Sequence, residues 1–171
     1  MMVWKPLRVR AIIALVVFGT IIGVLFHEAQ ARMTHLLPTY GTVPSFELMD
    51  HKGQRIARDT LHGSVWVADF IFTRCAGQCP MMTMQMARLA KTLGPYDSAK
   101  LVSFTVDPAW DTPEVLAGYV KAQGIASDSW HFVTGDQDVI YRLCREGFRL
   151  AVGEGEGSPD EPITHSVRVV L

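Results

Sequence analysis

The segment from Val65 to Leu93 constrains the fold more than any other part of the chain. It begins with an almost continuous run of β-branched and aromatic residues, typical of a central strand that is covered on both faces (Val65, Trp66, Val67, Phe70, Ile71 and Phe72). Pro80 suits the first position of a helix, and apolar residues at helical spacing follow it (Met82, Met86, Leu89, Ala90 and Leu93). Gly94 and Pro95 end that helix. The segment therefore predicts a buried strand, a short loop and a helix.

Two cysteines lie where the predicted strand joins the predicted helix. Cys79 is at the expected helix N-terminus and Cys75 is in the loop before it. The helix dipole favours a thiolate at this position and Arg74 acts in the same direction, so both sulfurs are candidate nucleophiles and soft metal ligands. The three intervening residues, including Gly77, allow a disulfide or a shared metal ion. A structural disulfide, or two cysteines without a role, is the alternative.

The motifs around these cysteines resemble the Sco/SenC family, thioredoxin-fold copper chaperones for cytochrome c oxidase assembly. The segment FTRCAGQCP is similar to the CxxxCP motif of that family. Three later segments follow in the order of the family: SFTVDPAWDTPEVLAGYV from Ser103, WHFVTGDQDVIYRLCREGFRLAV from Trp130, and THS from Thr164. Together these segments extend the resemblance over most of the chain from about Val43 onward.

The resemblance implies a three-layer, thioredoxin-like α/β fold with an N-terminal β-hairpin and right-handed crossovers between parallel strands. His165 matches the histidine that completes the copper site of the family, so the resemblance implies that Cys75, Cys79 and His165 bind copper. Two thiolates suit Cu(I), and two thiolates with an imidazole also suit Cu(II). The implied partner is the copper domain of cytochrome c oxidase subunit II, and another copper chaperone is a further candidate partner.

A copper metallochaperone is the leading hypothesis, and an enzyme is the alternative. In that alternative the chain is a thiol-disulfide oxidoreductase, and Cys75 and Cys79 alternate between a dithiol and a disulfide to keep the oxidase copper-site cysteines reduced. A peroxiredoxin-like peroxidase is a third hypothesis, which requires a Thr or Ser and an Arg around one attacking cysteine. His165 separates the first two hypotheses, because copper needs this ligand and thiol exchange does not. Whether the chain is an enzyme stays open.

Composition limits the remaining function classes. The chain has 171 residues, a formal net charge of −1 and 49% hydrophobic residues, which is sufficient for one compact domain with its own core. This charge excludes nucleic acid as a general partner. Only three cysteines are present, too few for a disulfide-stabilised scaffold.

The N-terminal segment predicts export of the domain. Lys5, Arg8 and Arg10 precede a run without charged residues, 11–26, so the N-terminus should stay in the cytoplasm while the segment enters the membrane. We expect residues 1–31 to be a basic stub with a membrane anchor, or a signal peptide cleaved near Ala29-Gln30-Ala31. Residues 32–42 read as a linker and 43–171 as the copper-binding domain. The expected location is a bacterial inner membrane, crossed once, with the domain facing the periplasm or the cell exterior.

The rest of the chain predicts further strands and helices. We expect a hairpin with its turn at Lys52-Gly53, strands at 101–106, 131–133, 149–152 and 167–171, and helices after Thr112 and Asp136. A flexible acidic loop is expected at 153–162. The chain ends in a predicted core strand where the family continues with a turn and a helix, so we expect the domain to be C-terminally incomplete.

Several polar residues are expected to have structural roles only. Asp107 and Asp111 are interpreted as turn and cap residues rather than as a catalytic pair. Cys144 is expected on the inner face of a helix, and His131 is expected to be a structural residue of a short strand. The turn residues His51 and His62 are expected at the surface.

Overall fold

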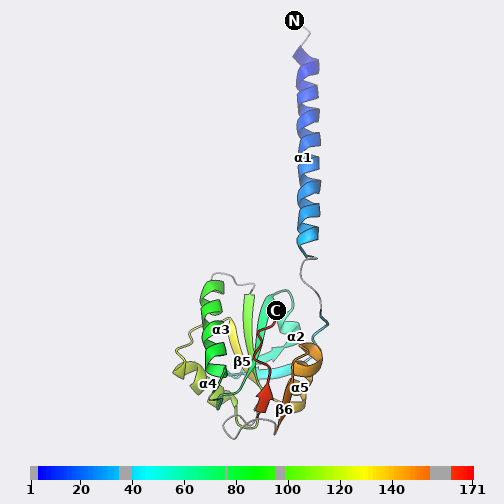
Figure 1. Cartoon of the computed structure of the whole chain (residues 1–171). Coiled ribbons are helices and arrows are strands. Elements are labelled where there is room, and N and C mark those ends of the chain that lie inside the picture. Colours follow the sequence, from blue (N-terminus) through cyan, green and yellow to red (C-terminus); the bar gives the residue numbers. More distant parts are fainter. Residues whose placement is uncertain (1–3, 35–39, 76, 95–98, 155–162) are drawn as a thin grey trace. The chain divides into compact units, whose positions relative to one another are not determined.

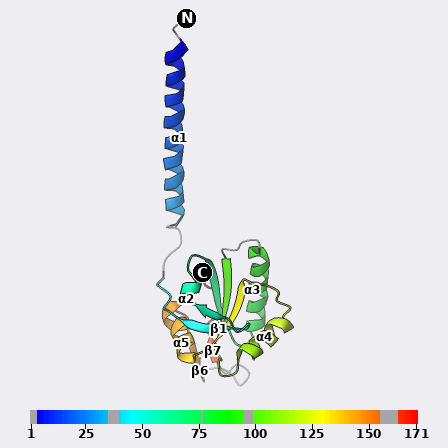
Figure 2. The ribbon, with the colours of Figure 1, turned by 180° about the vertical axis from the view of Figure 1, so that it is seen from behind.

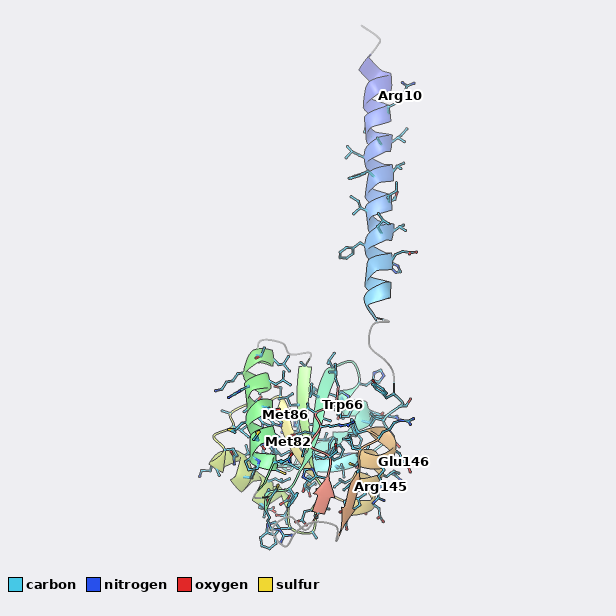
Figure 3. All side chains as sticks on the ribbon, in the orientation of Figure 1. Arg10, Trp66, Met82, Met86, Arg145 and Glu146 are labelled. Carbon is cyan, nitrogen blue, oxygen red and sulfur yellow. The ribbon has the colours of Figure 1, made fainter. Side chains whose placement is uncertain are left out.

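The computed structural model describes residues 4–34, 40–75, 77–94, 99–154 and 163–171. The chain divides into two units, Met1–Tyr40 and Gly41–Leu171. The first unit contains helix α1 (Trp4–Thr34), on which Arg10 is labelled in Figure 3. Across the described part of the chain, no helix has the length and apolarity needed to cross a membrane. The membrane anchor and the signal peptide both stay predictions.

A five-stranded mixed sheet forms the centre of the second unit, in the order β2-β1-β5-β4-β3. Strands β3, β4 and β5 run parallel, and β1 is antiparallel to both β5 and β2. The bounds are β1 (Glu47–Asp50), β2 (Arg55–Ala57), β3 (Val65–Ile71), β4 (Ala99–Thr105) and β5 (Trp130–Thr134). This mixed sheet, with its N-terminal hairpin, confirms the α/β part of the predicted fold class.

Helices cover both faces of this sheet. Helices α3 and α4 lie on one side in both views, and α5 lies on the other (Figures 1 and 2). A π-helical turn, η1, continues α5, and a separate antiparallel pair, β6 and β7, follows. The bounds are α2 (Arg58–Leu61), α3 (Cys79–Leu93), α4 (Pro113–Ala122), α5 (Gln137–Arg142), η1 (Leu143–Gly147), β6 (Val152–Glu154) and β7 (Ile163–His165).

The helices begin where the sequence indicates and bury the expected side chains. The Thr112 hydroxyl accepts a hydrogen bond from an N–H in the first turn of α4, and the carboxylate of Asp136 does the same for α5. Met82 and Met86, labelled in Figure 3, are buried on the inner face of α3. Helix α3 begins at Cys79, one residue before the predicted Pro80. The apolar stripe therefore docks α3 onto the sheet and fixes its N-terminus at the cysteine loop.

Aromatic rings form the core on the opposite face of β3 and β4. The rings of Phe70 and Phe104 stack at 5.3 Å between centroids, and Phe148 packs edge-on against Phe70 at 5.4 Å. Phe46 meets Phe104 edge-on at 5.5 Å. Such offset and edge-on pairs add about 0.5–1.5 kcal/mol each beyond the burial of their area. This core makes β3 and β4 a rigid base for the loops at their carboxyl ends.

Two predicted strands are wrong in position. The strand predicted at 149–152 begins only at Val152, because Arg149 adopts a positive φ of 54°, which a strand does not accommodate. In place of the strand predicted at 167–171, Val170 alone bridges Ala68 on β3, with N···O distances of 2.8 and 2.9 Å. A strand needs a partner along its length, and β-branched composition does not supply one. Most of the predicted acidic loop, residues 155–162, lies outside the described residues.

Candidate metal centre

Three segments far apart in the sequence bring the three predicted ligands together. The chain leaves β3 after Ile71 and turns at once, because the Cys75 N–H donates to the carbonyl oxygen of Phe72 at 3.2 Å. Cys79 is the first residue of α3, and His165 is the last residue of β7. The sequence forms this site because a strand, a tight loop and a helix follow one another, and a short hairpin then returns the chain to the same place.

The side chains of Cys75, Cys79 and His165 converge. Their ligand atoms all lie within 4.8 Å of one another, and within the described ranges this is the one group of three His, Cys, Asp or Glu side chains with metal-binding geometry. The Sγ atom of Cys79 is 3.3 Å from Nε2 of His165. Cys75 is 8% exposed and Cys79 is 1% exposed, whereas His165 is half-buried. The two cysteines are present as thiols rather than as a disulfide.

The orientation of the imidazole follows from its second nitrogen. Nδ1 of His165 lies 3.2 Å from the carbonyl oxygen of Ser166, which can only accept, so Nδ1 carries the proton. The lone pair of Nε2 therefore points toward Cys79. The ring of Phe72 meets the imidazole edge-on at 5.5 Å between centroids and limits its rotation. A histidine held in this way presents Nε2 as a ready ligand.

The electrostatics of Cys79 differ from the sequence-based expectation. Burial raises the pKa of the Cys79 thiol well above its ordinary value, and its hydrogen bond to Cys75 acts in the same direction. The helix N-terminus and Arg74 were expected to favour the thiolate, but the guanidinium of Arg74 faces Asp107 instead, with N···O distances of 3.1 and 2.5 Å. Desolvation therefore decides the protonation state. The buried thiol should lose its proton when a cation supplies positive charge.

Sequence reasoning missed one acidic residue beneath the site. Asp69 lies in the middle of β3 and is fully buried, and neither of its carboxylate oxygens has a hydrogen-bond partner among the described residues. Burial raises the pKa of Asp69 to about 7. The negative charge of Asp69 also contributes to the raised pKa of Cys79. The sequence signal that could have revealed Asp69 is that it is the one acidic residue in an otherwise apolar strand.

The remaining candidates lie outside this group. Cys144 is fully buried, and its Sγ atom is 3.6 Å from the carbonyl oxygen of Leu150, as expected for a core residue. Nδ1 of His131 is 2.9 Å from a carboxylate oxygen of the buried Asp50, so its role is structural. His62 follows α2 and is exposed.

Known proteins are similar to this chain in both sequence and fold. The SCO1/SenC family model matches residues 36–171. The SCO1 protein homolog of Bacillus subtilis is 35% identical over 117 residues, which cover 67% of this chain and 61% of that protein. The chain thus spans about three fifths of the length of this curated relative.

Solved structures agree with this assignment. BsSco, described as a member of the Sco family of cytochrome c oxidase assembly proteins with a disulfide switch, is 34% identical, with a TM-score of 0.64 over 72% of this chain and 73% of that chain. The fold is also that of Bradyrhizobium japonicum ScoI, solved with copper bound, which is 20% identical with a TM-score of 0.65 over 75% of this chain and 81% of that chain. The family model covers most of the chain, and the chain therefore belongs to the SCO1/SenC family.

Proposed function

We propose that this chain is a copper metallochaperone that delivers copper to the dinuclear copper site of cytochrome c oxidase subunit II. The observation that carries the proposal is the convergence of Cys75, Cys79 and His165 within 4.8 Å, in a chain of the SCO1/SenC family. The copper is cargo, and these three side chains are the ligands that would hold and release it.

The donor set fits copper better than the common alternatives. Two sulfur ligands select soft ions such as Cu(I), and an imidazole nitrogen extends the range to Cu(II). Hard ions such as Mg²⁺ and Ca²⁺ require oxygen ligands, which this group does not contain. A structural zinc site has four protein ligands, whereas the described residues supply three here. An incomplete ligand set suits an ion that must later leave.

The burial of the site also supports temporary storage. The thiols are nearly inaccessible to solvent, which would protect bound Cu(I) from water and oxidants, whereas His165 is only half-buried. A partner that supplies its own sulfur or nitrogen ligands would meet His165 first. The exposed Met81 and Met84 follow Cys79 on α3 and provide an adaptable surface for such a partner.

The second candidate function is a thiol-disulfide oxidoreductase. The observation that favours it is the pair of neighbouring thiols, Cys75 and Cys79, in a family whose member BsSco has a described disulfide switch. In this function the two thiols would reduce a partner disulfide through a mixed disulfide and become oxidised themselves. The raised pKa of Cys79 makes it a slow attacking thiol, so Cys75 would be the attacking residue.

We also propose that the domain lies outside the cytoplasm. Support comes from the basic residues Lys5, Arg8 and Arg10 ahead of the uncharged run 11–26, the charge pattern of a segment whose N-terminus stays inside. A reporter enzyme that is active only outside the cytoplasm, fused after Leu171, would test this location. Activity in intact cells is the expected result, and an inactive but stable fusion would contradict it.

Copper binding by the full chain tests the main proposal. We expect one copper per chain in an equilibrium competition with a Cu(I) chelator, and loss of this stoichiometry when Cys75→Ser and Cys79→Ser are combined. Cys144→Ala is the matched control, since it removes a buried thiol outside the site and should leave binding intact. Full stoichiometry in the double variant would refute the assignment. Delivery is then measured as copper transfer to the isolated subunit II copper domain.

A further inference from the structure

Side chains of the loop between β4 and α4 accept hydrogen bonds from Thr73 and Arg74, the two residues just before Cys75. One carboxylate oxygen of Asp111 accepts hydrogen bonds from the backbone N–H of Thr73 at 3.1 Å and from the hydroxyl of Thr105 at 2.5 Å. The other oxygen accepts a hydrogen bond from the hydroxyl of Thr73. Asp111 and Thr105 are fully buried, so water does not compete for these bonds. The backbone two residues before Cys75 is thereby attached to the end of β4.

A second carboxylate of the same loop holds the next residue. Asp107 accepts two hydrogen bonds from the guanidinium of Arg74, and that guanidinium also lies over the ring of Trp110, 4.6 Å from its centroid. The N–H of Asp107 donates to the hydroxyl of Thr105 at 3.0 Å, and that hydroxyl donates to the carboxylate of Asp111, so one threonine links the Asp107 backbone to the Asp111 side chain. Both residues before Cys75 are therefore fixed by side chains of one loop.

These contacts differ from the turn and cap roles expected from the sequence. The cap of α4 is Thr112, which accepts from the N–H of Val115 at 3.3 Å. Burying a carboxylate is unfavourable unless it is fully paired, so a loop that only had to turn would gain nothing from Asp107 and Asp111 at 7% and 0% exposure. Both carboxylates direct their oxygen atoms at the segment that carries Cys75.

The need for such contacts follows from where each ligand lies. Cys79 begins a helix and His165 ends a strand, so regular hydrogen bonding fixes both. Cys75 lies outside any helix or strand, and its N–H donates to the carbonyl oxygen of Phe72 in a turn. Its position relative to the other two ligands therefore depends on the residues just before it.

The geometry points to Asp107 and Asp111 as positioning residues that set the location of Cys75 in the copper site. This inference rests on the proposed function. Removing a group that orients a metal ligand typically reduces metal affinity roughly 10- to 100-fold. A loop that lets Cys75 move would also change how readily the two thiols reach disulfide distance, and this second property does not involve copper.

The experiment compares Asp111→Ala with Asp50→Ala in the full chain. Asp50 is a matched control, because it is also fully buried, accepts from Lys52 and Gln54 N–H groups and pairs with His131, but lies on β1, away from the cysteine loop. Two properties are measured: Cu(I) affinity against a chelator, and the dithiol–disulfide equilibrium of the copper-free chain in dithiothreitol redox buffers.

We expect Asp111→Ala to bind Cu(I) roughly 10- to 100-fold more weakly and to shift the dithiothreitol equilibrium. Asp50→Ala should lower the melting temperature while leaving both properties unchanged. Asp111→Asn keeps an oxygen for the Thr73 N–H and should restore part of the affinity. A folded Asp111→Ala chain with wild-type affinity and a wild-type dithiothreitol equilibrium would overturn the inference.

A further variant keeps the inference testable if Asp111→Ala does not fold. Thr73→Val removes the hydroxyl that donates a hydrogen bond to Asp111 and leaves the carboxylate itself in place. It should show a smaller shift in the same direction, and unchanged affinity and equilibrium would then overturn the inference. If the wild-type chain binds no copper but Asp111→Ala still shifts the dithiothreitol equilibrium, the proposed function fails and the positioning role stands.

Discussion

The Sγ atom of Cys79 lies 3.3 Å from Nε2 of His165, although 86 positions separate the two residues in the chain. Burial raises the pKa of Cys79 and Nδ1 of His165 donates to the Ser166 carbonyl, so Nε2 presents its lone pair to a thiol that keeps its proton in the copper-free chain. A metal that binds here must replace that proton. Metal binding at this contact is therefore coupled to the loss of the thiol proton of Cys79.

Replacing His165 by Ala should separate the two oxidation states of bound copper. The variant keeps both sulfurs, which suffice for Cu(I), and loses the nitrogen that Cu(II) prefers. We expect Cu(I) affinity to change by less than about tenfold, and the charge-transfer absorption of the Cu(II) form to disappear, in spectroscopic titrations with each ion. His62→Ala changes an exposed histidine and serves as the control. An intact Cu(II) spectrum in His165→Ala would remove this residue from the site.

Copper affinity should rise with pH. Since burial raises the pKa of the Cys79 thiol, the free site holds a proton at neutral pH that binding must release. Each displaced proton adds about one to the slope of log affinity against pH. Competition with a Cu(I) chelator from pH 6 to about 8 measures this slope. Replacing Cys79 by Ser should lower the slope by about one, and a slope of zero in the wild-type chain would contradict the shift.

The sequence predicted the site well because its strongest signals are local. A buried strand followed by a helix is visible in the run from Val65 and in the stripe ending at Leu93, and these signals place the cysteine loop. His165 could be placed only through family resemblance, since nothing in its neighbours indicates that a hairpin brings it to Cys79. Long-range proximity of this kind is not encoded in local periodicity.

The errors have a common physical origin. The ionisation of Cys79 was predicted from its neighbours in sequence, whereas burial, which depends on the whole fold, outweighs them. Asp107 and Asp111 were interpreted as turn and cap residues because their partners Arg74 and Thr73 lie more than thirty positions away in the sequence. The prediction of a strand at 167–171 was wrong because, among these residues, only Val170 pairs with another strand in the described part of the chain.

Met81 and Met84 should affect copper transfer but not copper binding. Both are more than half exposed on α3, at 60% and 55%, and follow Cys79 within two turns. Changing both to Gln removes two soft, adaptable apolar groups from the surface next to the site. We expect slower transfer to the isolated subunit II copper domain, with unchanged Cu(I) affinity. Met49→Gln, at an exposed methionine on β1, is the control, and wild-type transfer in the double variant would exclude a docking role.

Asp69 should make the copper-free domain less stable as pH rises, which is unusual for a carboxylate. Burial raises the pKa of Asp69 from 3.8 to about 7, so the native state binds the proton more tightly than the unfolded chain does. The contribution of Asp69 to the free energy of unfolding is therefore largest below about pH 4, and it is lost as the pH rises through about 7. A shift of about three pKa units corresponds to about 4 kcal/mol, as an order of magnitude.

Replacing Asp69 by Asn tests this effect. Denaturant unfolding between pH 4 and about 8 should show a flatter pH profile in the variant and, at the upper end, a free energy of unfolding about 1–3 kcal/mol above wild type. The gain is less than the full shift, because the buried amide also needs partners. Asp50→Asn should behave oppositely: burial would raise the pKa of Asp50, but its hydrogen bonds to His131, Gln54 and Lys52 outweigh burial and lower it, so its charge stabilises the fold at neutral pH. Parallel pH profiles for the wild type and Asp69→Asn would show that this carboxylate is not held in its neutral form.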